Sequence, residues 1–138
     1  MIRSIVAVIA GIVTLTATSF AIEAAANPLL MKMFPHTLPN EAALNHNTAV
    51  KLITLGYTAL CVVGGGFVTA WIARESKVIH AVVMGVILVG LTVALMLDEP
   101  QRAPRWAWVA LIVMSVPMAW LGAALLVWRS KLGTGETA

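Results

Sequence analysis

The sequence predicts an all-α protein, a four-helix transmembrane bundle with one longer outer loop. Hydrophobic residues make up 60% of the chain and charged residues 11%, whereas soluble domains average about 45–50% and about 25%. Four segments also run for about 20 residues without any Asp, Glu, Lys or Arg, the length of helix that crosses a bilayer core of about 30 Å. They are Ser4–Ile22, Leu52–Ala73, Val78–Leu97 and Trp106–Trp128. We expect one membrane domain over residues 1–138, with helices at about 3–26, 48–73, 77–97 and 105–129.

The first apolar segment is expected to be a retained helix. Arg3 precedes its apolar run and Ala24-Ala25-Ala26 follows it, an order similar to a secretory signal peptide with its cleavage site. The run is longer than the usual apolar region of about 7–15 residues, and Pro28 closely follows the candidate cleavage site. We therefore predict that the segment stays in the chain as its first membrane helix.

The connection Asn27–Asn47 is the one sizeable loop. Pro35 and Pro39 bracket a turn in it, and residues 40–44 are expected to form one short helical turn. Its apolar residues predict that the loop lies against the membrane surface or covers the outer mouth of the bundle. They are Leu29, Leu30, Met31, Met33 and Phe34.

Capping residues mark the starts of the second and third helices. Asn47-Thr48 is expected to cap the second helix, because short polar side chains accept hydrogen bonds from the first free backbone N–H groups. Ser76 is expected to cap the third helix after a tight turn at Arg74–Lys77.

Prolines mark the start and the middle of the fourth helix. Pro100 and Pro104 interrupt any helix between the third and fourth spans. Pro117 lies in mid-span and removes the hydrogen bond to the carbonyl of Val113. We expect a kink there, with the Ser115 hydroxyl helping to satisfy that carbonyl.

Basic and aromatic residues predict the orientation of the bundle. Lys and Arg concentrate in cytoplasmic loops, and Trp concentrates at both interfaces. With both termini in the cytoplasm, five basic residues lie inside and four outside. The inner set is Arg3, Arg74, Lys77, Arg129 and Lys131, and the outer set is Lys32, Lys51, Arg102 and Arg105. Trp71 and Trp128 would then share the inner interface, and Trp106 and Trp108 the outer one. The acidic Glu41, Asp98 and Glu99 also fall outside.

Small residues predict where the helices pack, because close approach rather than exclusion of water joins helices in lipid. The second span pairs Gly65 with Thr69 and Gly66 with Ala70 at four-residue spacing. Each glycine weakens a helix by up to about 1 kcal/mol against alanine, so a close neighbour is expected to compensate. The predicted packing residues are Gly64, Gly65, Gly66, Thr69 and Ala70. They serve either the interior of one bundle or a surface for a second copy or a larger membrane complex.

Glu23 is the candidate functional residue. Thr16, Ser19 and Glu23 lie at i, i+3 and i+7, on one face of the first helix. Ionisable residues within a span usually face the interior and mark a pathway or site. Two interpretations remain open: a polar pathway for a proton, cation or ligand, or a structural role in which Glu23 reaches headgroups or pairs with Lys51 or an outer arginine.

The remaining polar residues form no catalytic or metal-binding pattern. The histidines fit no zinc spacing such as HExxH, and no catalytic or phosphate-binding motif occurs. Cys61, the only cysteine, lies in an apolar run and is expected to act as a small hydrophobe. The net charge of +3 is too small and dispersed to favour nucleic acid. We expect no enzymatic activity, no metal and no cofactor.

One run resembles a known pattern. GGGFVTAWIAR at residues 64–74, followed by His80, resembles small four-helix bacterial membrane proteins of uncharacterised families, in which a glycine-rich second span ends in A-x-I-A-R. The resemblance spans residues 64–80 and implies a multi-pass protein of the bacterial cytoplasmic (inner) membrane, without implying an activity. Small multidrug exporters are similar in size, but Glu23 is expected near a helix end rather than in mid-span.

Two functions are therefore carried forward from the sequence. The leading hypothesis is a non-enzymatic accessory or structural membrane protein that acts through helix packing with itself or a larger complex. The alternative is a small transporter or channel in which Glu23, Ser19 and Thr16 line a polar pathway.

Overall fold

The structure is a computed structural model that describes residues 2–73 and 76–133, and these residues form five helices and no strand. The helices are α1 (Ile2–Met33), α2 (Glu41–His46), α3 (Thr48–Ile72), α4 (Lys77–Asp98) and α5 (Arg105–Gly133). Four of them, all but α2, are long and apolar enough to cross a membrane. The fold is an all-α bundle, as the sequence predicts, and its composition indicates a multi-pass membrane protein.

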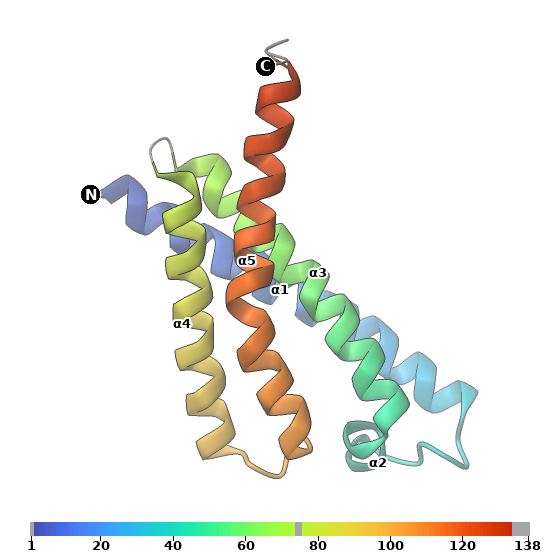
Figure 1. The fold of residues 1–138 in the computed structure, drawn as a ribbon. Coiled ribbons are helices and arrows are strands. Elements are labelled where there is room, and N and C mark those ends of the chain that lie inside the picture. The colour runs from blue at the N-terminus through green and yellow to red at the C-terminus, as the bar shows by residue number, and fades with distance from the viewer. Residues whose placement is uncertain (1, 74–75, 134–138) are drawn as a thin grey trace.

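Helix α3 lies at the centre of the bundle (Figure 1). It packs against α1 on one side and against the α4–α5 hairpin on the other, and α1 also contacts α4. Within the described part of the chain, no Cα atom of α1 lies within 8 Å of a Cα atom of α5. The two helices are therefore separated, and side chains from all four spans surround the space between them.

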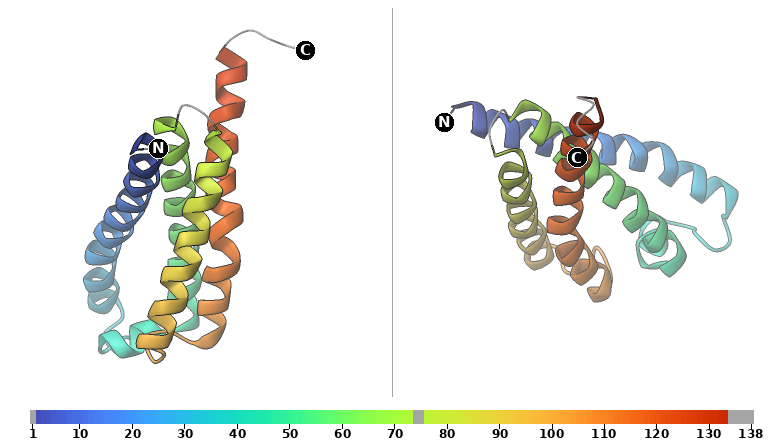
Figure 2. Two further views of the ribbon diagram at one scale, coloured as in Figure 1. Left: turned by 90° about the vertical axis from the view of Figure 1, so that its left-hand side faces the viewer. Right: turned by 45° about the horizontal axis from the view of Figure 1, so that its top comes forward.

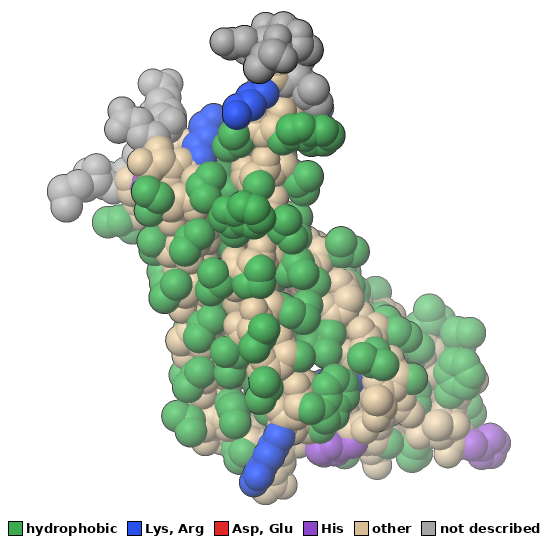
Figure 3. All heavy atoms as spheres, viewed as in Figure 1, with side chains coloured by type: hydrophobic (Ala, Val, Ile, Leu, Met, Phe, Trp, Pro, Cys, Tyr) green, Lys and Arg blue, Asp and Glu red, His purple; other side chains and the backbone are tan. Residues whose placement is uncertain are grey.

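The bundle has two distinct ends (Figure 2). The start of α1, the end of α3, the start of α4 and the end of α5 lie at one end, called here the terminal end. Helix α2 and the turn between α4 and α5 lie at the other, called the loop end. The surface between them is largely hydrophobic, with Lys and Arg side chains at the extremities of the visible face (Figure 3). This distribution suits a bundle whose middle faces acyl chains.

Three of the four predicted spans agree with the structure to within a few residues, but the end predicted for the first was wrong. Helix α1 continues through Asn27 and Pro28 to Met33, so the predicted loop is shorter at its start. Proline is tolerated inside membrane helices because neighbouring groups satisfy the freed backbone carbonyl. Leu30 and Met31 pack there against a small cluster that contains Leu44 of α2. This contact gives the extra turns of α1 a packing partner.

The predicted caps differ in outcome. The Asn47 side chain accepts hydrogen bonds from the backbone N–H groups of Ala49 and Val50, at 3.0 and 3.2 Å, and caps α3 as predicted. The short helical turn predicted after Pro39 is confirmed as α2, which Asn40 caps. The prediction for Ser76 was wrong: its φ is 50°, in the left-handed region, and its side chain makes no capping bond.

Two further expectations about α5 were wrong. The Ser115 hydroxyl donates to the carbonyl of Leu111 at 2.6 Å, rather than to the Val113 carbonyl that Pro117 leaves free. Trp108 is 6% exposed and packs with Ala103 and Ala107, so it faces the bundle rather than the interface. Trp106, in contrast, is 41% exposed.

The terminal half of the bundle is tightly closed. A Cβ atom on Gly11 of α1 would clash with the Thr69 hydroxyl, and it would lie 2.8 Å from both the Gly65 carbonyl and the Met84 sulfur. Thr69 and Met84 are fully buried and hydrogen-bonded to each other at 3.2 Å. We call this contact of α1, α3 and α4, formed by Gly11, Gly65, Thr69 and Met84, the seal.

Candidate functional site

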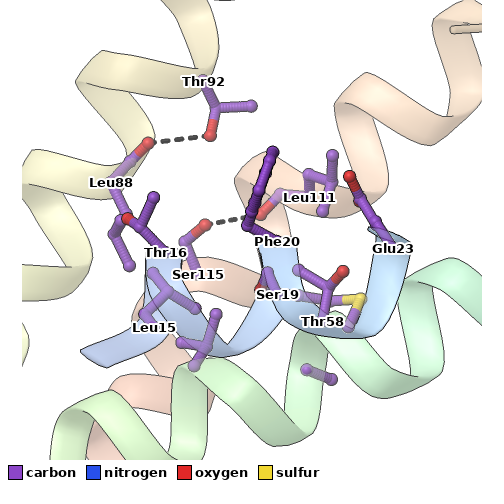
Figure 4. A pocket seen from close by; sticks show the side chains of 13 residues that line it. Leu15, Thr16, Ser19, Phe20, Glu23, Thr58, Leu88, Thr92, Leu111 and Ser115 are labelled. Carbon is purple, nitrogen blue, oxygen red and sulfur yellow. Dashed lines mark hydrogen bonds between the residues drawn. The ribbon is translucent and has the colours of Figure 1, made fainter. Parts of the chain in front are cut away.

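The three residues of the predicted polar face line one cavity. Thr16, Ser19 and Glu23 of α1 border a space of about 280 Å³ between α1 and α5, which we call the slot. The labelled side chains in Figure 4 come from all four long helices, and those of α1 lie across from Leu111 and Ser115 of α5. Phe20 borders the slot and is 72% exposed, so the slot reaches the surface of the bundle that faces lipid.

The interior of the slot is more apolar than its residue types suggest. Thr16, Thr92 and Ser115 line it, but each hydroxyl donates to the carbonyl one turn earlier in its own helix, at 2.6–2.8 Å. Two of these bonds are drawn in Figure 4. Such bonds satisfy the hydroxyl hydrogen internally, so the slot presents mainly hydrocarbon. Its apolar lining includes Leu15, Val62, Leu88, Leu111 and Met114.

Two further cavities adjoin the slot at Glu23. The first, about 250 Å³, lies among α1, α3 and the start of α5, and we call it the inner chamber. The second, about 510 Å³, lies among α1, α2 and α3, and we call it the mouth. Glu23 borders all three cavities, while Lys51 and Arg102 border the inner chamber and the mouth. Glu23 therefore lies where the apolar slot adjoins two cavities that Lys51 and Arg102 also border.

Glu23 lies deeper along its helix than the sequence predicted. Because α1 continues to Met33, Glu23 precedes the helix end by ten residues, roughly 15 Å at 1.5 Å per residue. Its carboxylate accepts a hydrogen bond of 3.1 Å from the hydroxyl of Tyr57 on α3. Neither Glu23 nor Lys51 forms an ion pair within 4.0 Å with any described residue, so the pairing considered from the sequence is not observed.

Lys51 and Arg102, the basic residues that border the inner chamber and the mouth, bind side chains other than Glu23. The Lys51 ammonium donates to the Asn45 side-chain oxygen at 3.2 Å, and it lies within electrostatic range of both Glu23 and Arg102. Arg102 pairs with Glu99 at 3.1 Å on the exposed α4–α5 turn. The inner chamber and the mouth are thus bordered by one negative and two positive side chains that do not pair with each other.

Two buried polar atoms at the inner chamber have no hydrogen-bonding partner among the described residues. They are the Ser19 hydroxyl oxygen and the indole nitrogen of Trp108. Both residues border the inner chamber together with Glu23 and Lys51. A buried donor without a partner costs about 1–3 kcal/mol. The inner chamber therefore has a hydroxyl and an indole N–H beside it for which the described residues supply no hydrogen-bonding partner.

The predicted packing residues occupy different environments. Gly65 belongs to the seal, and Gly66 faces the backbone of Ala119 on α5 so closely that a Cβ atom would clash. Ala70 is buried in a cluster with Ala123 of α5. Gly64 has nothing within 4 Å of the position of a Cβ atom, so its face is uncovered in the single chain.

The sequence does not indicate that Tyr57, Thr58 and Trp108 belong to the site. Lys51 is predicted only as a partner of Glu23 in the structural interpretation. Tyr57 gave one available signal, since it is the only tyrosine and lies within a span that has no charged residue. Trp108 was assigned to the interface from its position near a helix end, a rule that does not specify which way the ring turns.

Metal-ligating side chains do not cluster among the described residues. No group of three or more His, Cys, Asp or Glu side chains among them is placed to hold a metal ion. Cys61 is buried in the main hydrophobic cluster of the bundle. In comparisons with known proteins, no family model, no curated protein and no solved structure matches the chain.

Proposed function

We propose that this chain is a small non-enzymatic membrane transporter whose substrate is an amphiphile bound in the cavity around Glu23. The single observation that carries the proposal is the convergence of Thr16, Ser19 and Glu23 on a slot that adjoins two cavities bordered by Lys51 and Arg102. Pockets with apolar walls and a few convergent polar groups are the usual form of ligand sites. Of the functions considered from the sequence, this geometry favours the transporter.

The seal packs α1, α3 and α4 together on the terminal side of the slot, whereas the mouth lies beside α2 at the loop end, and this asymmetry supports transport. Leu15 borders the slot and also lies 3.3 Å from the position of a Cβ atom on Gly65, so the seal adjoins the slot on its terminal side. Transporters expose a central site alternately to the two sides of the membrane. In this proposal the structure represents the state open toward the loop end, and opening of the seal releases the substrate toward the terminal end.

The accessory hypothesis has less support. Its basis was the set of smooth small-residue faces, and Gly65, Gly66 and Ala70 are already covered within the single chain. The surface still open to a partner is the outward face of α3, where no atom lies within 4 Å of the position of a Cβ atom on Gly56 or Gly64. Such a face packs equally well against lipid.

Substitution of Glu23 tests the proposed transport. We expect vesicles containing the protein to accelerate movement between leaflets of at least one fluorescent single-chain amphiphile, measured by its accessibility to dithionite. The test set includes anionic, cationic, zwitterionic and uncharged headgroups. Glu23→Gln should reduce that rate about tenfold, because charge-assisted hydrogen bonds contribute about 1.5–3 kcal/mol.

The control is Asp98→Asn, which removes a carboxylate at the same end but borders none of the three cavities. It should leave the rate unchanged. An equal rate for wild type and Glu23→Gln would exclude Glu23 from the mechanism. No acceleration of any amphiphile would contradict the transport function itself.

We also propose that both termini face the cytoplasm of a bacterium and that the mouth opens outward. Support comes from Lys77, Arg129 and Lys131, which belong to the terminal end, and from the acidic Asp98 and Glu99 at the loop end. In a Cys61→Ala background, His36→Cys should react with a membrane-impermeant thiol reagent in intact spheroplasts. Ser76→Cys and Ser130→Cys should not react. Labelling of these two positions instead of position 36 would invert the topology.

A further inference from the structure

Glu23 and Lys51 carry opposite charges and both border the inner chamber, but they form no ion pair with each other. Glu23 is bonded to the Tyr57 hydroxyl, and Lys51 is bonded to the Asn45 side chain. A carboxylate offers about four acceptor positions and an ammonium three donors, so both groups keep unused capacity. Charges left unpaired at a partly buried site are unfavourable, and a ligand that supplies the matching charges would stabilise both.

The unpartnered donors add to the positive side of the chamber. Trp108 is 6% exposed, and neither its indole N–H nor the Ser19 hydroxyl has a partner among the residues that the structure describes. Both residues line the same chamber as Lys51 and Arg102. An indole N–H acts only as a donor. These groups therefore match a ligand group with several acceptor oxygens, such as a phosphate.

The adjoining slot specifies the rest of the ligand. Three of the five hydroxyls that line it, those of Thr16, Thr92 and Ser115, donate to their own helix backbones, and most of the remaining lining is apolar, so the slot matches a hydrocarbon chain. At about 280 Å³ it lies just below the usual range of ligand pockets, about 300–1,000 Å³. This volume favours one acyl chain over two.

We infer that the substrate is a single-chain lipid with a zwitterionic headgroup, whose ammonium binds Glu23 while its phosphate lies among Lys51, Arg102, Trp108 and Ser19. The inference rests on the proposed function and adds the chemical class of the substrate. The acyl chain occupies the slot and leaves the bundle beside Phe20, between α1 and α5. Glu23 and Lys51 thereby select a headgroup by its two charges together, and neither charge alone is sufficient.

Native mass spectrometry of the full-length protein in an uncharged detergent tests this inference. Four probes with the same acyl chain differ only in headgroup: lysophosphatidylethanolamine, lysophosphatidic acid, a monoacylglycerol and an alkyltrimethylammonium. We expect the first to bind about tenfold more tightly than each of the others. Glycerophosphoethanolamine, which has the headgroup but no chain, should compete weakly, and this result would distinguish a lipid from a soluble headgroup as the substrate.

Two substitutions should shift the preference in opposite directions. Glu23→Gln removes the negative charge that binds the ammonium, so lysophosphatidic acid should bind as tightly as the zwitterion. Lys51→Met removes a donor to the phosphate, so the preference should shift toward the alkyltrimethylammonium. The matched controls are Asp98→Asn and Lys32→Met, whose side chains border none of the three cavities. Both should keep the wild-type order.

The possible outcomes separate the inference from the proposed function. If wild-type protein prefers a purely anionic, purely cationic or uncharged amphiphile, the zwitterion is excluded while a transporter of amphiphiles remains. If no probe binds the wild-type protein at saturating concentration, or if all four bind equally, the inner chamber does not distinguish headgroups by charge and the inference fails. The wild-type comparison requires no variant, so misfolding of a substituted chain does not affect it.

Discussion

Gly66→Leu is expected to separate α3 from α5 and to prevent stable folding of the bundle. A Cβ atom at position 66 would clash with the carbonyl of Ala119 and would lie 3.0 Å from its Cα. Those atoms are backbone, so they do not move aside as the tip of a flexible side chain does. Overpacking a well-packed interior usually costs about 1–3 kcal/mol, and we expect the upper end of this range or more. The measurement is unfolding by increasing SDS in mixed micelles, followed by far-UV circular dichroism.

The matched control is Gly64→Leu, two residues earlier in the same glycine triplet. Nothing lies within 4 Å of the position of its Cβ atom, and leucine favours helix over glycine by up to about 1 kcal/mol. This variant should therefore be as stable as wild type or slightly more stable. Equal destabilisation at both positions would show that the triplet acts as a whole, against the assignment of Gly66 alone to the α3–α5 contact.

Met84→Ala is expected to have the second largest effect, because it opens the seal. Met84 is fully buried, and its sulfur accepts the hydrogen bond of the buried Thr69 hydroxyl. Truncation of a buried methionine to alanine costs about 2–5 kcal/mol in soluble proteins. In lipid the driving force for burial is absent and the loss of packing remains, so we expect about 2–3 kcal/mol. The same SDS titration gives this value.

Two companion variants identify the origin of that loss. Met84→Leu restores apolar volume but not the sulfur acceptor, so the stability it fails to recover belongs to the Thr69 hydrogen bond. Leu91→Ala removes a side chain from the same helix that is 48% exposed, and it should cost less than about 1 kcal/mol. If Met84→Ala is no more destabilising than Leu91→Ala, the seal does not hold the terminal half of the bundle together.

The candidate site was only partly predictable from the sequence. The spacing of Thr16, Ser19 and Glu23 fixes them to one face of α1, because a helix returns to the same side every 3.6 residues. That rule operates within one helix. It does not show that Tyr57 donates to Glu23 from a position 34 residues away, or that Trp108 turns inward to border the same chamber. Both facts depend on which faces of different helices meet.

The sequence by itself determined the class of the fold, the number of spans and most helix bounds. Those properties depend on neighbouring residues in the sequence. A long run without charges is stable in lipid, and a helix there hydrogen-bonds its own backbone groups. Asn47 caps the backbone N–H groups that directly follow it. The end of α1 was the exception. In a soluble protein Pro28 would indicate the end of a helix. Here α1 continues for five residues beyond it, to Met33, because Leu30 and Met31 pack against the cluster that contains Leu44 of α2.

Only the tertiary structure decided how the helices pair and where the cavity opens. In a soluble helix the polar face identifies the side that faces water, but a membrane helix is apolar on both its lipid-facing and protein-facing sides. Hydrophobic periodicity therefore carries little information about the partner. The choice depends on close backbone contacts such as Gly11 with Gly65 and Gly66 with Ala119. These contacts place α3 between α1 and α5, and the separation of those two helices leaves the slot beside Glu23.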